Sequence, residues 1–126
     1  MNLLLDTHVL LWWLDDNPES SEKAREVIAS PSSTIYVSSA SVWEISIKVK
    51  IGKLEISSPD LVQEIEDSDF LPLPIEAHHA WLAGDLTRHH NDPFDRMLIA
   101  QAQSEDLILV TRDSAFQDYG VSILPA

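Results

Sequence analysis

Short apolar runs alternate with segments of helical period along this chain, and this alternation constrains the fold more than any other feature. Strand-like runs occupy residues 2–5, 34–39 and 107–111, with shorter ones at 70–74 and 121–125. Helical patterns occupy residues 8–14, 20–30, 41–52, 57–67, 76–86 and 93–105, with a short turn or helix at 114–120. Because parallel strands need a crossover of about a dozen residues, usually a helix, this order predicts parallel pairing. We therefore expect an α/β fold: a three-layer α/β/α domain with a central, mostly parallel sheet of four to five strands.

Length and composition fit one domain over residues 1–126 and exclude several common kinds of site. The absence of cysteine excludes disulfides, thiolate zinc sites and cysteine nucleophiles. The glycines, Gly52, Gly84 and Gly120, are too far apart for a Walker loop, a dinucleotide-binding turn or a nucleophile elbow. The apolar start lacks a basic leader and a cleavage site, and no run is long enough to span a membrane. We expect a cytoplasmic protein.

The charge is strongly negative, with 21 acidic against 8 basic residues and a formal net charge of −13. Taken globally, this balance argues against broad electrostatic attraction to nucleic acid or anionic lipid. The bases are unevenly placed, and Lys48, Lys50 and Lys53 form one group. That group is either a solvated helix end favoured by the helix dipole or a local phosphate contact.

Four acids fall where the predicted topology brings chain segments together. Asp6 ends the first strand, Asp113 follows the strand at 107–111, and Glu44 lies in the first turn of the helix after 34–39. Asp95 lies in the first turn of the helix at 93–105, which runs back antiparallel to the strand that comes after it. In open parallel sheets, ligands bind at the carboxyl ends of the strands. We therefore expect the four carboxylates to converge on one crevice there.

Each acid also has an alternative role in helix capping. Asp92-Pro93-Phe94-Asp95 reads as a cap, a proline at the first helical position and an acid near the start. Ser41 and Glu44 have the spacing of a capping box, and Asp6 and Asp113 each precede a helical segment. Neutral residues are expected to cap other helices, Ser20 or Ser21 in one case and Ser58 in another. Acids near helix starts stabilise by roughly 0.3–1 kcal/mol each.

Capping does not offset the cost of gathering four charges. Two carboxylates about 4 Å apart repel by about 4 kcal/mol at an effective dielectric near 20. A divalent cation removes this repulsion, and oxygen ligands without cysteine suit Mg²⁺ or Mn²⁺. We expect Asp6 and Asp95 to be direct ligands, and Glu44 and Asp113 to act through waters or to complete a second metal site. Such a metal neutralises phosphate and activates water, which indicates phosphoryl chemistry.

These segments resemble the PIN-domain family, specifically the VapC-type toxin ribonucleases of toxin–antitoxin pairs. The resemblance spans essentially the whole chain: LLLDTHVLLWWL, SSASVWEISIKVKIGKL and HHNDPFDRMLIAQAQSEDLILVTRD carry it, and the last is the most specific. By position, the acidic quartet of the family falls on Asp6, Glu44, Asp95 and Asp113, and Thr111 matches the hydroxyl residue that accompanies the last acid. The resemblance implies an Mg²⁺-dependent endoribonuclease that cleaves RNA, forms a homodimer and is inhibited by a small antitoxin protein.

Several neighbouring residues keep two interpretations. His90, like His89, contacts substrate or packs in the loop. Asp92 is a helix cap or a further ligand. Arg96 and Arg112 flank quartet members, so each contacts a phosphate or forms an ion pair with those acids. Trp12 and Trp13 are buried between layers, or one of them faces a dimer or antitoxin surface.

Two other classes of function remain open alternatives. A phospho-signalling receiver domain has similar size, alternation and Mg²⁺ use, but it needs an acidic pair after the first strand and a lysine after a late one. Here Asp6 stands alone and no lysine occurs after Lys53. A catalytically inactive PIN-like binding module is the other alternative, and it predicts tight partner binding without RNA cleavage.

Overall fold

Five short parallel strands form one central sheet in the computed structural model, which describes residues 1–126. The strands are β1 (Asn2–Leu5), β2 (Thr34–Ser38), β3 (Leu71–Leu73), β4 (Ile108–Thr111) and β5 (Ile123–Pro125), in the order β3-β2-β1-β4-β5. Every neighbouring pair is parallel, with Leu4 opposite Tyr36 on one side and Leu109 on the other. The predicted parallel sheet is confirmed, and all five carboxyl ends therefore lie along one edge.

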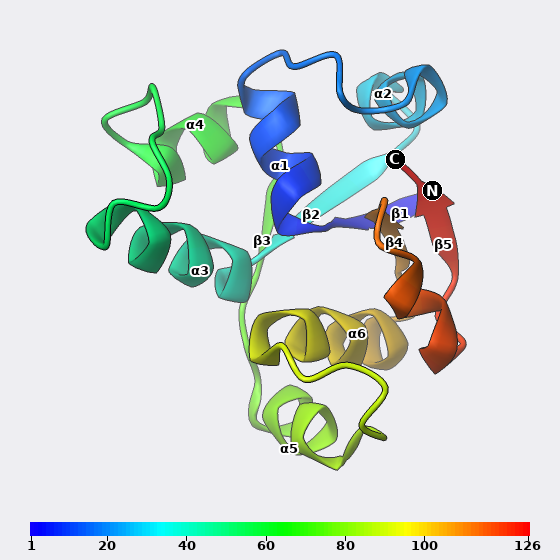
Figure 1. Cartoon of the computed structure of the whole chain (residues 1–126). Helices are drawn as coiled ribbons and strands as arrows, with labels where there is room; N and C mark the ends of the chain where they lie inside the picture. Colours follow the sequence, from blue (N-terminus) through cyan, green and yellow to red (C-terminus); the bar gives the residue numbers. More distant parts are fainter.

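Helices cover both faces of this sheet, as Figure 1 shows. They are α1 (Thr7–Leu14), α2 (Glu22–Ala29), α3 (Ser39–Lys50), α4 (Leu61–Asp67), α5 (Ala77–Asp85) and α6 (Pro93–Glu105), followed by the 3₁₀ helix η1 (Ser114–Tyr119). The first four helices lie on one side of the sheet, α6 lies on the other, and α5 packs against α6. The three-layer α/β/α architecture is confirmed. None of the helices has the length and apolar character needed to cross a bilayer.

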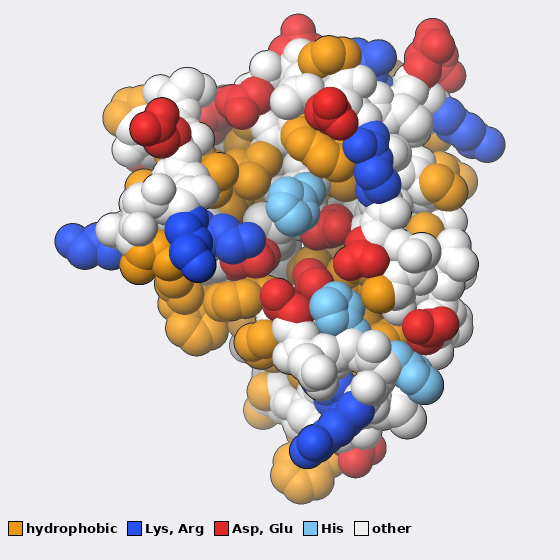
Figure 2. Space-filling model, viewed as in Figure 1, with side chains coloured by type: hydrophobic (Ala, Val, Ile, Leu, Met, Phe, Trp, Pro, Cys, Tyr) orange, Lys and Arg blue, Asp and Glu red, His pale blue; other side chains and the backbone are white.

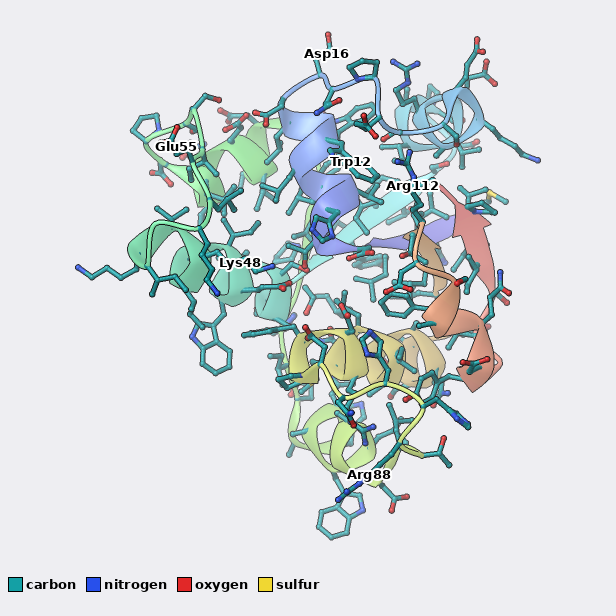
Figure 3. All side chains as sticks on the ribbon, in the orientation of Figure 1. Trp12, Asp16, Lys48, Glu55, Arg88 and Arg112 are labelled. Carbon is teal, nitrogen blue, oxygen red and sulfur yellow. The ribbon has the colours of Figure 1, made fainter.

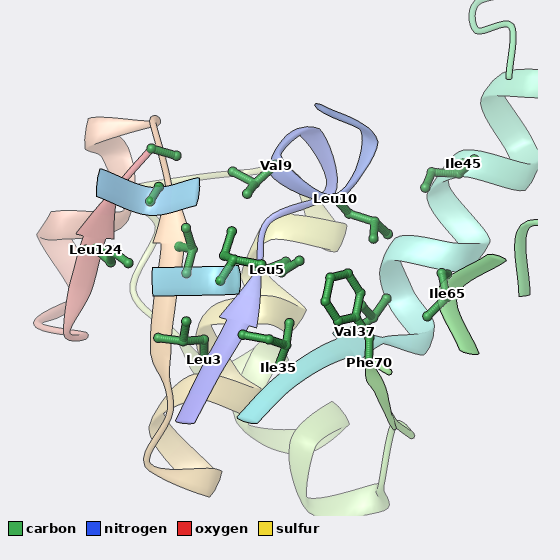
Figure 4. Close-up of a cluster of buried hydrophobic side chains, with 14 residues drawn as sticks. Leu3, Leu5, Val9, Leu10, Ile35, Val37, Ile45, Ile65, Phe70 and Leu124 are labelled. Carbon is green, nitrogen blue, oxygen red and sulfur yellow. The ribbon is translucent and has the colours of Figure 1, made fainter. Parts of the chain in front are cut away.

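The core consists of two apolar clusters, one on each face of the sheet. Along β1, Leu3 and Leu5 enter the larger cluster with residues of α1 to α4 (Figure 4), whereas Leu4 enters the smaller one with Leu98 and Leu109. All three leucines of β1 are fully buried. A strand covered on both faces needs apolar residues at successive positions, which explains the unbroken run at 3–5. Burial of each side chain contributes roughly 1.5–3 kcal/mol.

Two predicted helix starts are wrong. Helix α3 begins at Ser39, directly after β2, and the Ser38 hydroxyl caps it by accepting from the Ala40 N–H at 3.0 Å. Glu44 therefore lies in the second turn and forms no capping box with Ser41. Helix α4 is capped by Asp60, which accepts from the Gln63 N–H at 3.1 Å, and not by Ser58. The cap of α2 is Ser21, one of the two serines expected there, Ser20 and Ser21.

Candidate active site

The four acids of the predicted quartet come from four separate elements at the carboxyl edge of the sheet. Asp6 lies after β1, Asp113 lies after β4, Glu44 lies on α3 after β2, and Asp95 lies in the first turn of α6. In Figure 2 acidic side chains gather in a hollow at the centre of this face, with a histidine on each side. The predicted convergence of these chain segments is therefore observed in the structure.

Asp6 and Asp113 are joined through the hydroxyl of Thr111. The Thr111 Oγ1 donates to Asp6 Oδ2 at 2.6 Å and accepts from the Asp113 N–H at 3.0 Å. Asp6 sits at the start of α1, but its side chain makes no capping hydrogen bond. The carboxylate is therefore oriented toward the site by Thr111 and has no part in helix capping. Asp113, by contrast, accepts from the Ala115 N–H at 2.9 Å and caps η1.

Asp95 and Asp113 meet at the ring of His90. The Nε2 atom of His90 lies 2.7 Å from Asp95 Oδ2 and 3.8 Å from Asp113 Oδ2. One ligand atom of each of these three residues lies within 4.8 Å of the others, which is a spacing that a single ion can bridge. Of the two adjacent histidines, His90 is the one that the structure brings into contact with the quartet.

Glu44 lies at the α3 side of the site and is nearly buried, with 6% of its surface exposed. Its carboxylate pairs with the ammonium of Lys48 one turn later, at 3.1 Å. Nearby, the Thr7 hydroxyl donates to the Ser41 hydroxyl at 3.0 Å, and this buried bond joins the first turns of α1 and α3. The Lys48 ammonium thus neutralises the buried Glu44 carboxylate.

Burial and mutual repulsion raise the pKa of two of these carboxyls. Desolvation raises the pKa of Asp6, although its hydrogen bond from Thr111 opposes this effect. For Asp95, desolvation and the negative charges of Asp92, Asp6 and Glu44 raise the pKa to about 7, and the nearby His90 opposes the increase. The four carboxylates therefore carry an unfavourable charge density at neutral pH when no cation lies between them.

This donor set fits a divalent cation. Asp95 and Asp113 offer carboxylate oxygens close together, with Asp6 linked to them through Thr111, and Mg²⁺ and Mn²⁺ prefer oxygen ligands. The cation would also remove the repulsion that raises the pKa of Asp95. Of the two expected direct ligands, Asp95 lies in one group with Asp113 and His90, and these residues would hold the cation. Asp6, the other expected ligand, is linked to this group through Thr111.

The start of α6 has the predicted pattern of a capped helix. Asp92 Oδ1 accepts from the Phe94 N–H at 2.9 Å and from the Asp95 N–H at 3.1 Å, and Pro93 occupies the first turn. The cap fixes the direction in which Asp95 leaves the helix. Asp92 therefore positions a neighbouring carboxylate and also adds to its electrostatic repulsion.

The two arginines that flank quartet members in the sequence form no ion pair with those acids. Arg96 points back from α6 and donates to five backbone carbonyls, those of Ala83, Gly84, Leu86, Thr87 and His90, at 2.7–3.4 Å. It thereby closes the end of α5 and the loop after it. Arg112 instead pairs with Glu19 at 3.0 Å and lies over the ring of Trp12, 4.5 Å from its centre.

Two further residues around the site had no predicted role in it. Tyr119 holds the loop that carries His90: its hydroxyl accepts from the His90 N–H at 2.7 Å and donates to the Thr87 carbonyl at 2.9 Å. Lys48 was expected only at a helix end or against a phosphate. Its pairing with Glu44 is detectable in the sequence, because residues four apart on a helix face one another. Nothing local in the sequence links Tyr119 to His90, which lies 29 positions earlier.

The fold and the site together define the class of this protein. The family model of the PIN domain matches residues 3–121, which is nearly the whole chain. The chain therefore belongs to the PIN-domain family. Among curated proteins, none matches its sequence.

Several solved structures with the same architecture come from toxin–antitoxin complexes. The VapBC2 complex of Rickettsia felis bound to a promoter DNA fragment matches with a TM-score of 0.70 and 19% identity, over 99% of this chain and 98% of that one. The DNA-bound VapBC of Salmonella typhimurium matches with a TM-score of 0.68 and 19% identity, also over 99% of this chain and 98% of that one. VapBC-5 of Mycobacterium tuberculosis matches with a TM-score of 0.62 and 18% identity, over 99% of this chain and 98% of that one. At these identities the likeness establishes a shared fold.

Proposed function

We propose that this protein is a divalent-metal-dependent endoribonuclease and the toxin of a toxin–antitoxin pair. One observation carries the proposal: four carboxylates from four chain segments meet at the carboxyl edge of the sheet of a PIN domain. Membership of that family also favours this function over a phospho-signalling receiver. Several solved structures with the same fold are VapBC complexes, which supports an antitoxin as partner.

The chemistry assigned to the site is hydrolysis of an RNA phosphodiester. Mg²⁺ or Mn²⁺ held by the carboxylates supplies charge neutralisation and a water of lowered pKa. The residues of the chain then have distinct tasks. Asp95 and Asp113 would hold the cation, and Thr111 orients the carboxylate of Asp6 by a hydrogen bond. Glu44 completes the negative site. Its pair with Lys48 holds the Lys48 ammonium where a phosphate oxygen can approach.

His90 has a binding task in this scheme. Its Nε2 lies 2.7 Å from Asp95 Oδ2 and 3.8 Å from Asp113 Oδ2, which places the ring beside the carboxylates, where it can contact a substrate phosphate. A homodimer and a cytoplasmic location complete the proposal, in keeping with the sequence resemblance.

The test is RNA cleavage by purified variants of the full chain. Asp95→Asn and Asp6→Ala should abolish Mg²⁺-dependent cleavage of single-stranded RNA while the circular dichroism of the protein stays native. The matched control is Asp85→Asn, which removes one exposed carboxylate at the end of α5 and should keep wild-type activity. Full activity of a folded Asp95→Asn variant would refute the assignment. A wild-type protein that binds its partner but never cleaves RNA would favour the inactive binding module.

A further inference from the structure

We infer that the hollow beside the carboxylates on the α1 side binds the nucleotide next to the scissile phosphate, an inference that rests on the proposed function. This hollow has a volume of about 330 Å³ and is lined by Asp6, His8, Val9, Trp12, Arg112 and Asp113. Two of its lining residues belong to the acidic quartet. A group bound in it therefore lies directly against the site, and its size is near the lower end for small-ligand pockets.

Arg112 is a fixed cation at the rim of this hollow. Its Nε donates to the Ala126 carbonyl at 3.3 Å, one Nη group pairs with the Glu19 carboxylate at 3.0 Å, and the other donates to the Glu19 backbone carbonyl. The guanidinium also rests on the Trp12 ring. Because a guanidinium has five N–H donors, two remain for a further acceptor. With half of its side chain exposed, Arg112 is preorganised to bind a phosphate oxygen.

Trp12 and His8 supply the aromatic part of the same hollow. They lie one turn apart on α1, with ring centres 6.2 Å apart and planes inclined by 31°. In Figure 3, Trp12 on α1 and Arg112 after β4 lie side by side above the acidic site, and Lys48 lies across from them. Aromatic side chains beside a cation are the usual elements for binding single-stranded nucleic acid, because every base has a face that can stack. The base is therefore placed against His8 and Trp12, and its phosphate against Arg112.

The charge of the hollow favours a nucleotide over a protein segment. The chain has only eight basic residues, and two of them, Lys48 and Arg112, stand on opposite sides of the carboxylates. An apolar peptide has a better place elsewhere, in the groove of Val37, Val42, Trp43, Val62 and Phe70, where six of nine lining residues are hydrophobic. The α1 hollow instead combines a cation, two aromatic rings and the acids that hold the metal.

The experiment measures binding of short single-stranded RNA in Mg²⁺ to proteins that also carry Asp95→Asn, so that the RNA stays intact. A set of RNAs, each with one abasic position, locates the base that the protein contacts. Removal of that base should weaken binding about tenfold to the Asp95→Asn protein. The same removal should have no effect once Trp12→Leu or His8→Ala is added. Arg112→Gln should weaken binding to all RNAs and reduce the slope of log affinity against log salt by about 1.

Two matched controls make the same chemical changes far from the hollow. Trp81→Leu removes a tryptophan that is 79% exposed on α5, and Arg88→Gln removes an exposed arginine in the loop before α6. Both should bind RNA like the parent. His8 is exposed, so His8→Ala keeps the test decisive if Trp12→Leu fails to fold.

The outcomes separate this inference from the proposed function. If wild type cleaves RNA and the Trp12, His8 and Arg112 variants bind and cleave like the controls, the inference is overturned and the proposed function stands. If these variants lose only binding to a protein partner, the hollow is a protein-binding surface and the inference is likewise overturned. If wild type cleaves no RNA, the proposed function fails, whereas the abasic-RNA measurement still reports on the hollow.

Discussion

Among the carboxyls of the site, Asp95 has the pKa that its surroundings raise most. It is partly buried, and Asp92, Asp6 and Glu44 all repel its charge, so its pKa is raised to about 7. A carboxyl with this pKa is close to half protonated at neutral pH. A divalent cation held at the proposed site would therefore compete with protons for this side chain in the physiological range.

This competition predicts how the stability of the metal-free protein depends on pH. The pKa of Asp95 rises from 3.8 to about 7 on folding, so between these values the folded state binds more protons than the unfolded state. The free energy of unfolding then falls as pH rises through this window, by about 2–4 kcal/mol in total, and is flat above it. Urea unfolding in EDTA at pH 5 and pH 8 measures the difference.

Two comparisons check whether Asp95 causes this slope of the free energy of unfolding against pH. The Asp95→Asn variant should lose most of it and be more stable than wild type at pH 8 without metal. Mg²⁺ should stabilise the wild type at pH 8 and have little effect at pH 5. An equal slope in wild type and Asp95→Asn would show that Asp95 is not the group responsible.

At the scale of single residues, the sequence predicts contacts that depend only on position along a strand or helix. Asp6 and Asp113 each come just after a buried strand, and parallel topology alone brings such positions together. The hydrogen bond from Thr111 to Asp6 joins residues 105 positions apart, and its geometry depends on the register of β1 against β4. The contact of His90 with Asp95 could not be predicted from the sequence either, because it depends on a loop that Tyr119 and Arg96 hold in place.

Among the elements, α6 does more than present Asp95. Its first turn is capped by Asp92, and Arg96 reaches back from it to the end of α5 and the adjoining loop. Hydrogen bonds from a charged donor are among the more valuable ones, at about 1.5–3 kcal/mol each. Helices α5 and α6 are therefore linked by one side chain.

We predict that Arg96→Gln destabilises the protein by about 2–4 kcal/mol, because several half-buried carbonyls lose their donor. Thermal and urea unfolding measure the loss. The matched change Arg88→Gln, at an exposed position in the loop that Arg96 anchors, should alter stability by less than about 0.5 kcal/mol. If Arg96→Gln and Arg88→Gln behaved alike, the carbonyl contacts would contribute nothing, and a phosphate role for Arg96 would again need a test.

The starts of the helices show the limit of prediction from a local sequence pattern. The spacing of Ser41 and Glu44 matches a capping box, yet α3 begins at Ser39, because β2 leads into it without a loop. Ser38 ends the strand and caps the helix at once. At α4, Ser58 and Asp60 are both good caps, and only the path of the preceding loop selects Asp60. Residue type predicts that a cap exists, and tertiary structure decides which residue it is.

The whole molecule carries a net charge of −13, which opposes the approach of RNA. A bound divalent cation inverts the charge at the site itself. We predict that RNA binding to the wild type is weak in EDTA and rises at least about tenfold with Ca²⁺, which uses the same oxygen ligands as Mg²⁺. Fluorescence anisotropy measures both states, with gel analysis to verify that the RNA is intact. Equal affinity with and without the cation would place the RNA away from the carboxylates.

The architecture as a whole was the most predictable level. Alternation of apolar runs with helical segments implies parallel crossovers, and that constraint holds whatever the exact ends of the elements. Even the marginal run at 70–74 forms β3, which is only three residues long because Pro72 and Pro74 limit pairing. Which helices cover which face was not predicted, since Leu3, Leu4 and Leu5 are equally apolar and only the sheet assigns them to opposite sides.

The hydrogen bonds that anchor the loop at 86–92 are made through its backbone. Arg96 holds the carbonyls of Leu86, Thr87 and His90, and the Tyr119 hydroxyl holds the His90 N–H. The side chains of Arg88 and Asn91 are exposed and take no part in either anchor. These two positions can therefore accept a variant library or a chemical label without displacing Asp95 or the carboxylate site.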